Sequence, residues 1–288
     1  YMGPAWYQRE IEIPAAWKGK RIFLYFERTH WLSSVYVGKE EVSKIDYISI
    51  PHNHELTQWL HPGKKELITF CIDNRYQYDT HKWDHAHSEF TQINWNGVLG
   101  EIKLVAVDPV YVDDMQVYPD IKNKSIKVKM TVRNCTEHTA SGKISFHVTG
   151  KDYRLQKEVP VTVTDSITYI EEEMFLGKDI HLWNEFHPNL YTLDCKLTSS
   201  VDGQSYAHEK STTFGMREVE AGEDHIILNG EPIHLRGTVE NAVFPKTGYA
   251  PVDDASWERV LRILKEYGMN HMRFHSWCPP AAAFRMAD

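Results

Sequence analysis

The sequence predicts a mainly-β protein in which two consecutive β-sandwiches precede a strand–helix–strand unit. Three observations lead to this prediction. Short apolar runs broken by turn residues fill the chain from residue 6 to about residue 214, the pattern resets after Asp108-Pro109, and a helical period replaces alternation after Gly215. At 288 residues, with 42% hydrophobic and 25% charged residues, the chain is long enough to bury two or three cores.

Residues 1–108 are expected to form a sandwich of jelly-roll type. Their apolar runs are WYQREIEIP, RIFLYFE, SSVYVGKEEV, YISIP, KELITFCID and VLGEIKLVAV. A jelly roll has about eight strands, whereas about six are counted here, so further strands are expected upstream of Tyr1. Residues 35–42 are typical of a hairpin that turns at Gly38.

One long segment without periodicity, residues 74–96, interrupts this first sandwich. Long loops in compact domains tend to be functional, and the aromatic content argues against disorder. The segment carries six side chains of metal-binding type: His81, His85, His87, Asp79, Asp84 and Glu89. Because their spacing is irregular, we interpret them as a polar loop that faces solvent or substrate, and we expect no metal.

Residues 109–214 are expected to form an immunoglobulin-like β-sandwich, because seven short strands follow one another within about 105 residues. The Cys-Trp-Cys framework of antibody domains is missing. The four cysteines, Cys71, Cys135, Cys195 and Cys278, lie far apart and indicate neither a disulfide framework nor a zinc site.

Residues 215–288 change to a strand–helix–strand pattern. We predict strands at residues 233–236 and 269–275, with a helix between them that begins at Asp253 or Asp254 and ends at Gly268. One helix face is apolar and comprises Trp257, Val260, Leu261, Leu264 and Tyr267. This order implies a parallel βαβ unit, and a (β/α)₈ barrel of about 250 residues would have only its beginning here.

The charge balance and apolar runs exclude some partners. A net charge of −8 and a pI near 6.1 give no broad positive field, so neither nucleic acid nor an anionic membrane is expected as a partner. No apolar run approaches the roughly 18 residues of a membrane helix. The 9 Trp and 15 Tyr residues fit either β-sandwich cores or sugar binding, in which aromatic rings stack on pyranoses.

Four motifs, in this order, resemble glycoside hydrolase family 2, which includes β-galactosidases, β-glucuronidases and β-mannosidases. They are GPAWYQREIEIP (3–14), NWNGVLGEIKL (94–104), LWNEFHPNLYTL (182–193) and FGMREVEAGEDHIILNGEPIHLRG (214–237). The resemblance implies a sugar-binding jelly roll at 1–108, an immunoglobulin-like domain at 109–214 and the start of a TIM barrel at 215–288. We expect Trp6, Tyr7, Leu182, Trp183 and Leu190 to be core or domain-contact residues.

The resemblance implies that the chain is the N-terminal portion of a retaining β-glycosidase that acts on an oligo- or polysaccharide without a cofactor. Such enzymes need two carboxyl groups about 5 Å apart, an acid/base and a nucleophile. In family 2 both lie on later barrel strands, so they are expected beyond Asp288, and this chain alone should be inactive. Two alternatives are a noncatalytic carbohydrate-binding module and a β-rich structural spacer. The resemblance also implies export to the periplasm or secretion.

The resemblance further implies which residues contact the sugar. In family 2 the loop that corresponds to Asn94, Trp95 and Asn96 helps to hold the terminal sugar; the alternative is a structured turn. At the barrel start, the carboxyl ends of the strands would carry the remaining candidates, for which structural ion pairs are the alternative. They are Arg236, Glu240, Arg273, His275 and Trp277.

Two departures from the family pattern concern these same strands. Where the family has Asn-Arg-His-Glu after the first strand, this chain has Thr238, Val239, Glu240 and Asn241. Where it has Arg followed by Ser-His-Tyr-Pro, this chain has Arg273-Phe-His-Ser-Trp-Cys-Pro-Pro280. The sugar is therefore left open. An incomplete barrel would expose Ile233, Leu235, Met272 and Phe274, which predicts self-association through this edge.

Overall fold

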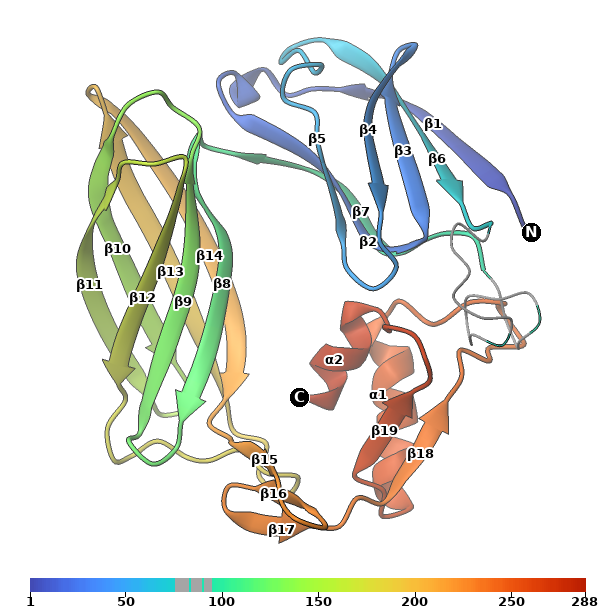
Figure 1. The fold of residues 1–288 in the computed structure, drawn as a ribbon, viewed down its shortest axis with the longest axis vertical. Helices are drawn as coiled ribbons and strands as arrows, with labels where there is room; N and C mark the ends of the chain where they lie inside the picture. The colour runs from blue at the N-terminus through green and yellow to red at the C-terminus, as the bar shows by residue number, and fades with distance from the viewer. Residues whose placement is uncertain (76–82, 84–89, 91–94) are drawn as a thin grey trace. The chain divides into compact units, whose positions relative to one another are not determined.

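The computed structural model describes residues 1–75, 83, 90 and 95–288 (Figure 1). Residues 1–106 and 235–288 form one compact unit, and residues 107–234 form the other. The chain is mainly β, as predicted from its alternating patterns. Neither α-helix in the described part of the chain has the length and apolar character needed to cross a membrane.

The first sandwich consists of a four-stranded sheet, β1-β6-β3-β4, and a three-stranded sheet, β5-β2-β7. Its strands are β1 (Pro4–Glu12), β2 (Arg21–His30), β3 (Leu32–Val37), β4 (Glu40–Asp46), β5 (His52–Glu55), β6 (Lys65–Asp73) and β7 (Gly97–Val107). Alternate residues of β2 and β3 face a shared core in which Phe26, Val35, Leu56 and Ile72 are fully buried. The predicted hairpin is confirmed, since β3 and β4 turn at Gly38 with a positive φ of 62°.

The expected strand at residues 47–51 is wrong. The strand in this region is β5, which begins at His52 and has the polar sequence His-Asn-His-Glu. Its two histidines point into the sandwich and are fully buried, as is Ser33 of β3. Polar side chains can replace apolar ones at these positions because they satisfy one another's hydrogen bonds.

These three residues belong to a hydrogen-bond chain whose proton positions follow from its acceptors. His52 Nε2 lies 2.8 Å from the carbonyl oxygen of Tyr47, so Nε2 carries the proton and Nδ1 accepts from Ser33 Oγ at 2.6 Å. Ser33 Oγ then accepts from His54 Nε2 at 2.8 Å, and His54 Nδ1 accepts from Ser43 Oγ at 2.8 Å. These roles take both imidazoles as neutral, which agrees with the lowered pKa values that burial gives them, and the chain then runs in one direction from Ser43 to Tyr47.

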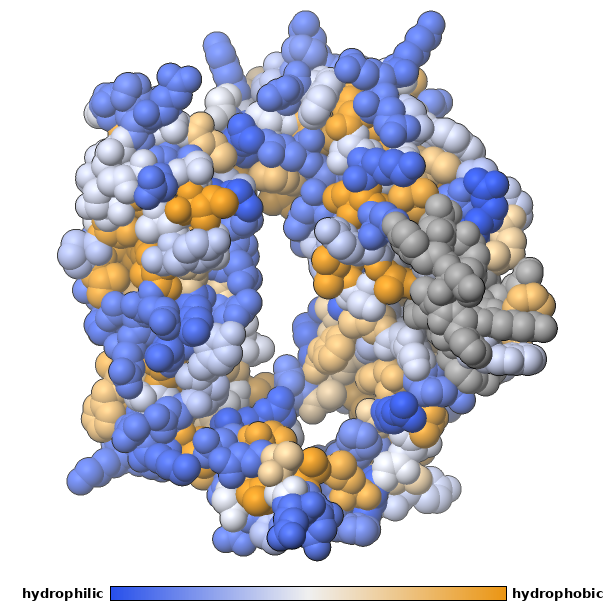
Figure 2. All heavy atoms as spheres, in the orientation of Figure 1, coloured by the Kyte–Doolittle hydropathy of each residue, from blue (hydrophilic) through white to orange (hydrophobic). Residues whose placement is uncertain are grey.

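The second sandwich contains the seven strands that the sequence predicts. They are β8 (Val110–Asp120), β9 (Ser125–Asn134), β10 (Ala140–Thr149), β11 (Arg154–Val163), β12 (Ile167–Phe175), β13 (Leu190–Val201) and β14 (Gln204–Gly215). They pair in the orders β11-β10-β13-β14 and β12-β9-β8, and Ile144, Phe146 and Leu193 are fully buried between the sheets. In the view of Figure 2, hydrophobic residues on this unit form small patches among hydrophilic ones.

A small antiparallel sheet follows, made of β15 (Val219–Ala221), β16 (Ile226–Leu228) and β17 (Glu231–Ile233). The turn between β16 and β17 is Asn229-Gly230, and both residues have positive φ, 54° and 84°. An Asn-Gly pair in this conformation matches the twist of a tight hairpin. The strand expected at residues 233–236 is therefore wrong, because Ile233 ends β17 and the next strand begins only at Gly237.

The parallel strand–helix–strand unit is observed, and it is formed by β18 (Gly237–Glu240), α1 (Asp254–Glu266) and β19 (His271–Phe274). The predicted cap is present, since Asp253 Oδ1 accepts a hydrogen bond from Ser256 N at 2.8 Å. Trp257 of α1 is 1% exposed and packs on Ala282 and Ala283 of a second helix, α2 (Ala281–Ala287). Tyr267, expected on the apolar face of α1, is 78% exposed.

Several aromatic and apolar residues of the motifs are more exposed than expected. Trp6 is 59% exposed, Tyr7 is 40% exposed and Leu190 is 37% exposed, so these three are not core residues. Trp6 lies on the outer face of the β1-β6-β3-β4 sheet, with its ring centroid 5.5 Å from that of Tyr36. Leu182 and Trp183 are partly buried, and the guanidinium of Arg217 lies over the Trp183 ring.

Candidate functional site

The carboxyl ends of the two parallel strands bring three of the predicted site residues together with a fourth that the sequence did not indicate. Glu240 is the last residue of β18, whereas His275 and Trp277 follow β19. The backbone oxygen of Glu240 accepts from His275 N at 2.8 Å and from Trp277 Nε1 at 3.4 Å. His275 Nδ1 lies 3.1 Å from Asn241 Oδ1, so this nitrogen donates to the amide oxygen.

The Glu240 carboxylate holds the turn that follows its own strand. It accepts hydrogen bonds from Ala242 N at 2.9 Å and from Val243 N at 3.3 Å. Ala242 is buried with a positive φ of 57°, a conformation that a residue with a Cβ rarely adopts. Burial raises the pKa of the Glu240 carboxyl group, and the backbone N–H groups oppose that shift. The carboxylate thus fixes an unusual backbone turn at the end of the strand.

Trp277 lies in a cluster of aromatic rings. Its ring centroid is 5.5 Å from that of Phe274 and 6.3 Å from that of Phe244, and both pairs are edge-to-face. Phe274 in turn contacts Trp257 of α1. The indole is half-buried and packs against the cluster of Trp257, Ala282 and Ala283.

Of the two arginines predicted at this site, Arg236 lies at the other end of β18, whereas Arg273 lies within β19, one residue before its end. Arg236 precedes β18, at the amino end of the strand. Its Nε donates to the Gly268 oxygen at 2.6 Å and its backbone N donates to Asn270 Oδ1 at 2.8 Å, so it ties the end of α1 to the strand. Arg273 lies within β19 opposite Val239; it is exposed and has no ion-pair partner among the described residues.

The base of the segment 76–94 is the second place where predicted site residues lie. Asn94 falls outside the described residues, as do the six side chains of metal-binding type. Trp95 and Asn96 are described, and both are half-buried. The carbonyl oxygen of Trp95 accepts from His30 Nδ1 at 2.8 Å and from Asn74 Nδ2 at 3.0 Å, and the His30 and Trp95 ring centroids are 4.7 Å apart.

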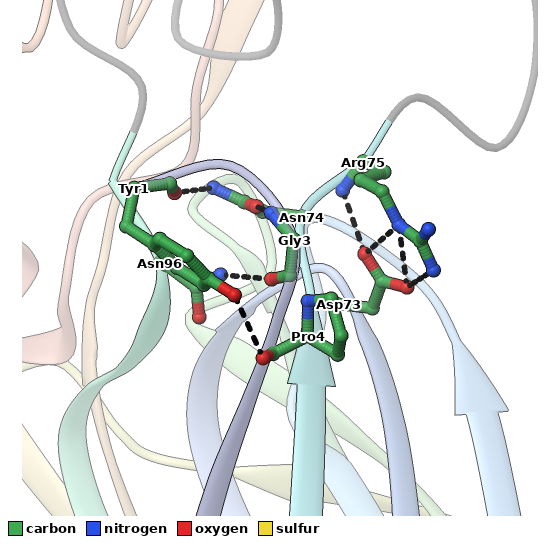
Figure 3. A network of polar contacts seen from close by, with 7 residues as sticks. All are labelled: Tyr1, Gly3, Pro4, Asp73, Asn74, Arg75 and Asn96. Carbon is green, nitrogen blue, oxygen red and sulfur yellow. Dashed lines mark hydrogen bonds and ion pairs between the residues drawn. The ribbon is translucent and has the colours of Figure 1, made fainter.

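Amide side chains at this base hold the start of the chain (Figure 3). Asn74 is fully buried; its Oδ1 accepts from Gly3 N at 2.9 Å and its Nδ2 donates to the Tyr1 oxygen at 2.9 Å. Asn96 Nδ2 donates to the Gly3 oxygen at 2.7 Å. Asn96 Oδ1 is buried without a donor among the described residues.

An ion pair closes the same end of β6. Arg75 Nη2 lies 2.6 Å from Asp73 Oδ2, and hydrogen bonds from Arg75 hold the pKa of the Asp73 carboxyl group below its usual value. Elsewhere in the described part of the chain, no group of three or more His, Cys, Asp or Glu side chains is arranged to hold a metal ion.

Three residues of these two places escaped the sequence analysis. Asn241 directly follows Glu240, so its position beside a strand end was a usable signal. Asn74 begins the segment 74–96 that the sequence singled out, but nothing indicated its bond to the Trp95 oxygen, 21 positions away. His30 had no signal, because it lies 65 positions from Trp95, whose oxygen it also binds. Hydrogen bonds to a backbone oxygen depend on strand pairing and leave no mark in the identity of the acceptor residue.

Comparison with known proteins identifies relatives of the whole chain. Residues 110–217 match the family model "Glycosyl hydrolases family 2". A β-galactosidase from Thermoanaerobacter pseudethanolicus is 23% identical over 290 residues, which cover 99% of this chain and 38% of the relative. A putative β-glucuronidase from Formosa agariphila is 26% identical over 290 residues, which cover 96% of this chain and 26% of the relative.

Solved structures of the same kind share the fold. Bacteroides uniformis β-glucuronidase 2, bound covalently to cyclophellitol-6-carboxylate aziridine, aligns with a TM-score of 0.82 at 19% identity over 100% of this chain and 35% of its own. A β-glucuronidase from Ruminococcus gnavus in complex with D-glucuronic acid aligns with a TM-score of 0.76 at 20% identity over 100% and 49%. The chain thus spans well under two thirds of the proteins it matches, and it is a partial segment related to the β-glycosidases of glycoside hydrolase family 2.

Proposed function

We propose that this chain supplies the terminal-sugar side of the substrate pocket in a retaining β-glycosidase and does not hydrolyse glycosides by itself. The observation that supports this most directly is the grouping of Glu240, Asn241, His275 and Trp277 at the carboxyl ends of β18 and β19. Active sites of (β/α)₈ enzymes lie at that end of the strands. The order of the chain, with two sandwiches before the strand–helix–strand unit, also supports this proposal.

The grouped side chains have the chemistry of a pyranose site. Sugars are held by a few directional hydrogen bonds and by an aromatic ring against their C–H faces. His275 and Asn241, which are joined by a hydrogen bond from His275 Nδ1, supply polar groups at the strand ends. Trp277 supplies the ring.

The acid/base and the nucleophile are proposed to lie in the part of the parent protein that follows Asp288. Glu240, a described carboxylate at the strand ends, is already engaged by two backbone N–H groups and stabilises its own turn. A retaining mechanism needs a second carboxyl group about 5 Å from the first. We therefore assign Glu240 a structural role beside the sugar.

The test compares this chain with a longer product of the same gene on a panel of aryl β-galactosides, β-glucuronides and β-mannosides. We expect hydrolysis only by the longer protein, and we expect the tryptophan fluorescence of this chain to change on titration with the matching sugar. Trp277→Phe should weaken that sugar response, whereas Trp183→Phe, in the other unit, should not. Release of aryl alcohol by this chain above a heat-inactivated control would disprove the proposal.

Arg273 offers a test of whether the sugar carries a carboxylate. It is a guanidinium on β19 without an ion-pair partner among the described residues, and it could pair with the carboxylate of a uronic acid. If the substrate is a β-glucuronide, Arg273→Leu in the longer protein should raise its KM strongly and leave a neutral galactoside unaffected. An equal effect on both substrates would assign Arg273 a structural role.

A noncatalytic carbohydrate-binding module is the second candidate, and one observation favours it. The exposed ring of Trp6 lies beside the half-buried ring of Tyr36 on the outer face of the first sandwich, where Gln8 Nε2 donates to Thr69 Oγ1 at 2.8 Å. An exposed ring beside polar side chains can bind a sugar chain. This candidate predicts binding that Trp6→Ala abolishes and Trp277→Phe leaves unchanged.

Self-association through the edge of the strand–helix–strand unit is also a proposal. Leu235 and Val239 are 43% and 51% exposed, whereas Met272 and Phe274 are partly covered by packing against Trp257. Exposed apolar residues beside an open parallel edge favour association. Light scattering coupled to gel filtration should detect dimers or larger species, and Val239→Lys should reduce them.

A further inference from the structure

Glu27 is a buried carboxylate whose partners are distant in the sequence. It lies on β2 and is 6% exposed. Its Oε2 accepts from Glu101 N of β7 at 2.8 Å, and its Oε1 accepts from Ala281 N, the first residue of α2, at 2.7 Å. A Cβ atom at Gly100 would collide with this carboxylate, so only glycine leaves it room. The side chain therefore links the first sandwich to the segment after β19.

Arg28 binds the same segment with the opposite polarity. Its Nε donates to the backbone oxygen of Pro279 at 3.0 Å, and its Nη1 donates to the backbone oxygen of Glu27 at 2.8 Å. One residue thus accepts from the N–H of Ala281 while its neighbour donates to a carbonyl oxygen two residues earlier. Both ends of the peptide segment 279–281 are held, which fixes its position along β2 as well as its distance from it.

Three further contacts hold residues 277–285 to the strand–helix–strand unit. Trp277 Nε1 is bound to the Glu240 oxygen, and Ala282 and Ala283 pack on Trp257. Arg285 Nη2 lies 2.6 Å from Asp254 Oδ1 of α1. These contacts are all within the strand–helix–strand unit, so they do not determine where the segment lies against the first sandwich.

We propose that Glu27 and Arg28 are positioning residues, which set the location of the loop that carries His275 and Trp277 by clamping its end, residues 279–281, to the first sandwich. The inference rests on the proposed function, because the loop with His275 and Trp277 is taken as part of a sugar site. The clamp itself is independent of what the site binds. It explains why the alternation of buried and exposed residues along β2 breaks at Phe26 and Glu27, since Phe26 faces the core while Glu27 lies beneath this segment.

The substitution Glu27→Gln tests the clamp with little change of shape. A glutamine can offer one acceptor oxygen, but its NH₂ group then faces one of the two backbone donors. Loss of a buried hydrogen bond to a charged group should speed amide exchange at that donor by about tenfold to a hundredfold. The matched control is Glu10→Gln, an exposed carboxylate of the same sandwich that lies 3.5 Å from Lys65 Nζ.

The experiment measures amide hydrogen exchange in the 288-residue chain, together with the imidazole NMR signal of His275. We expect Glu27→Gln to accelerate exchange in residues 275–287 and to shift the His275 signal, while strands β8 to β14 and the Glu10→Gln variant stay unchanged. Arg28→Met should act in the same way, and Arg28→Lys, which keeps a donor, should restore part of the protection.

Two results would overturn the proposal. Unchanged exchange in residues 275–287 would mean that Glu27 does not hold the segment. Faster exchange through the whole unit with an unshifted His275 signal would mean that Glu27 contributes only to general stability. The proposed sugar site is tested separately: a wild-type chain that binds none of the sugars on the panel would refute that function, whereas the exchange and NMR results would still decide the role of the clamp.

Discussion

Acidification should destabilise the first sandwich in a pH range set by its two buried histidines. His54 is fully buried, and burial, together with the neighbouring His52, lowers its pKa to about 3 from 6.5. Burial also lowers the pKa of His52, although its hydrogen bond to the Tyr47 oxygen and the charge of Asp46 oppose the shift. The folded state therefore prefers neutral imidazoles, whereas the unfolded chain protonates them readily below pH 6.5.

The sign and size follow from this difference. A histidine with a lowered folded pKa contributes stability that is complete above the unfolded pKa and is lost as the pH falls toward the folded one. For His54 the window runs from about pH 6.5 to about pH 3. At pH 5 the loss from His54 alone is about 2 kcal/mol, since each unit of pKa difference is worth about 1.4 kcal/mol. Asp73 contributes at lower pH, because its carboxyl group has a lowered pKa.

Urea unfolding at pH 7 and pH 5, followed by tryptophan fluorescence, measures this loss. The signal reports mainly on the first unit, because Trp183 is the only tryptophan between residues 107 and 234. His54→Gln keeps a donor toward Ser33 but cannot titrate, so it should shrink the difference between the two pH values by about 2 kcal/mol. The exposed His61→Gln serves as the control. An undiminished pH difference in His54→Gln would refute the assignment of neutral, buried imidazoles.

Three further substitutions test other parts of the structure, each by urea unfolding. Gly100→Ala should destabilise the first unit by about 1–3 kcal/mol, because alanine would have to adopt the positive φ of 83°. The collision of its Cβ with Glu27 should add a further loss. An unchanged urea midpoint would contradict this prediction. Phe146→Ala should cost the second sandwich about 3–5 kcal/mol, because the ring is fully buried, and a loss below 1 kcal/mol would show that the core collapses around it. Asn74→Ala should lower the free energy of unfolding by about 1–3 kcal/mol, because Gly3 N and the Tyr1 oxygen both lose their hydrogen-bond partner. It should also speed proteolysis at the first residues. If cleavage there is no faster than in wild type, the Asn74 hydrogen bonds do not hold the start of the chain.

The second sandwich could be predicted from the sequence because its strands each have one buried and one exposed face. In β9, for example, Ile126, Val128, Met130 and Val132 are buried and the residues between them are more exposed. Such a pattern can be recognised without knowing which strands pair with β9, since the side chains of a strand alternate in direction. Local patterns likewise predicted the hairpin at Gly38, and the spacing of apolar residues along one face predicted the helix that begins beside Asp253.

The polar strand β5 could not be predicted in the same way. Its buried positions are histidines, and what makes them acceptable is Ser33, which lies 19 and 21 positions earlier. An apolar pattern search instead chose the neighbouring residues 47–51. Glu27 was missed for the same reason, as its partners lie 74 and 254 positions away. Buried polar groups are specified by pairs of distant residues, and one strand read alone contains only half of each pair.

The misplacement of Arg236 shows how a small error in an element changes a functional assignment. Asn229-Gly230, between two apolar runs, was a direct signal for a hairpin, and that hairpin ends at Ile233. Once Ile233 is assigned to it, the parallel strand must begin later, and Arg236 moves from the carboxyl end of a strand to its amino end. Glu240 and Asn241 then occupy the end where His275 and Trp277 lie. The sugar contacts proposed here therefore follow from the register of β18 against β19, which pairs Glu240 with Phe274.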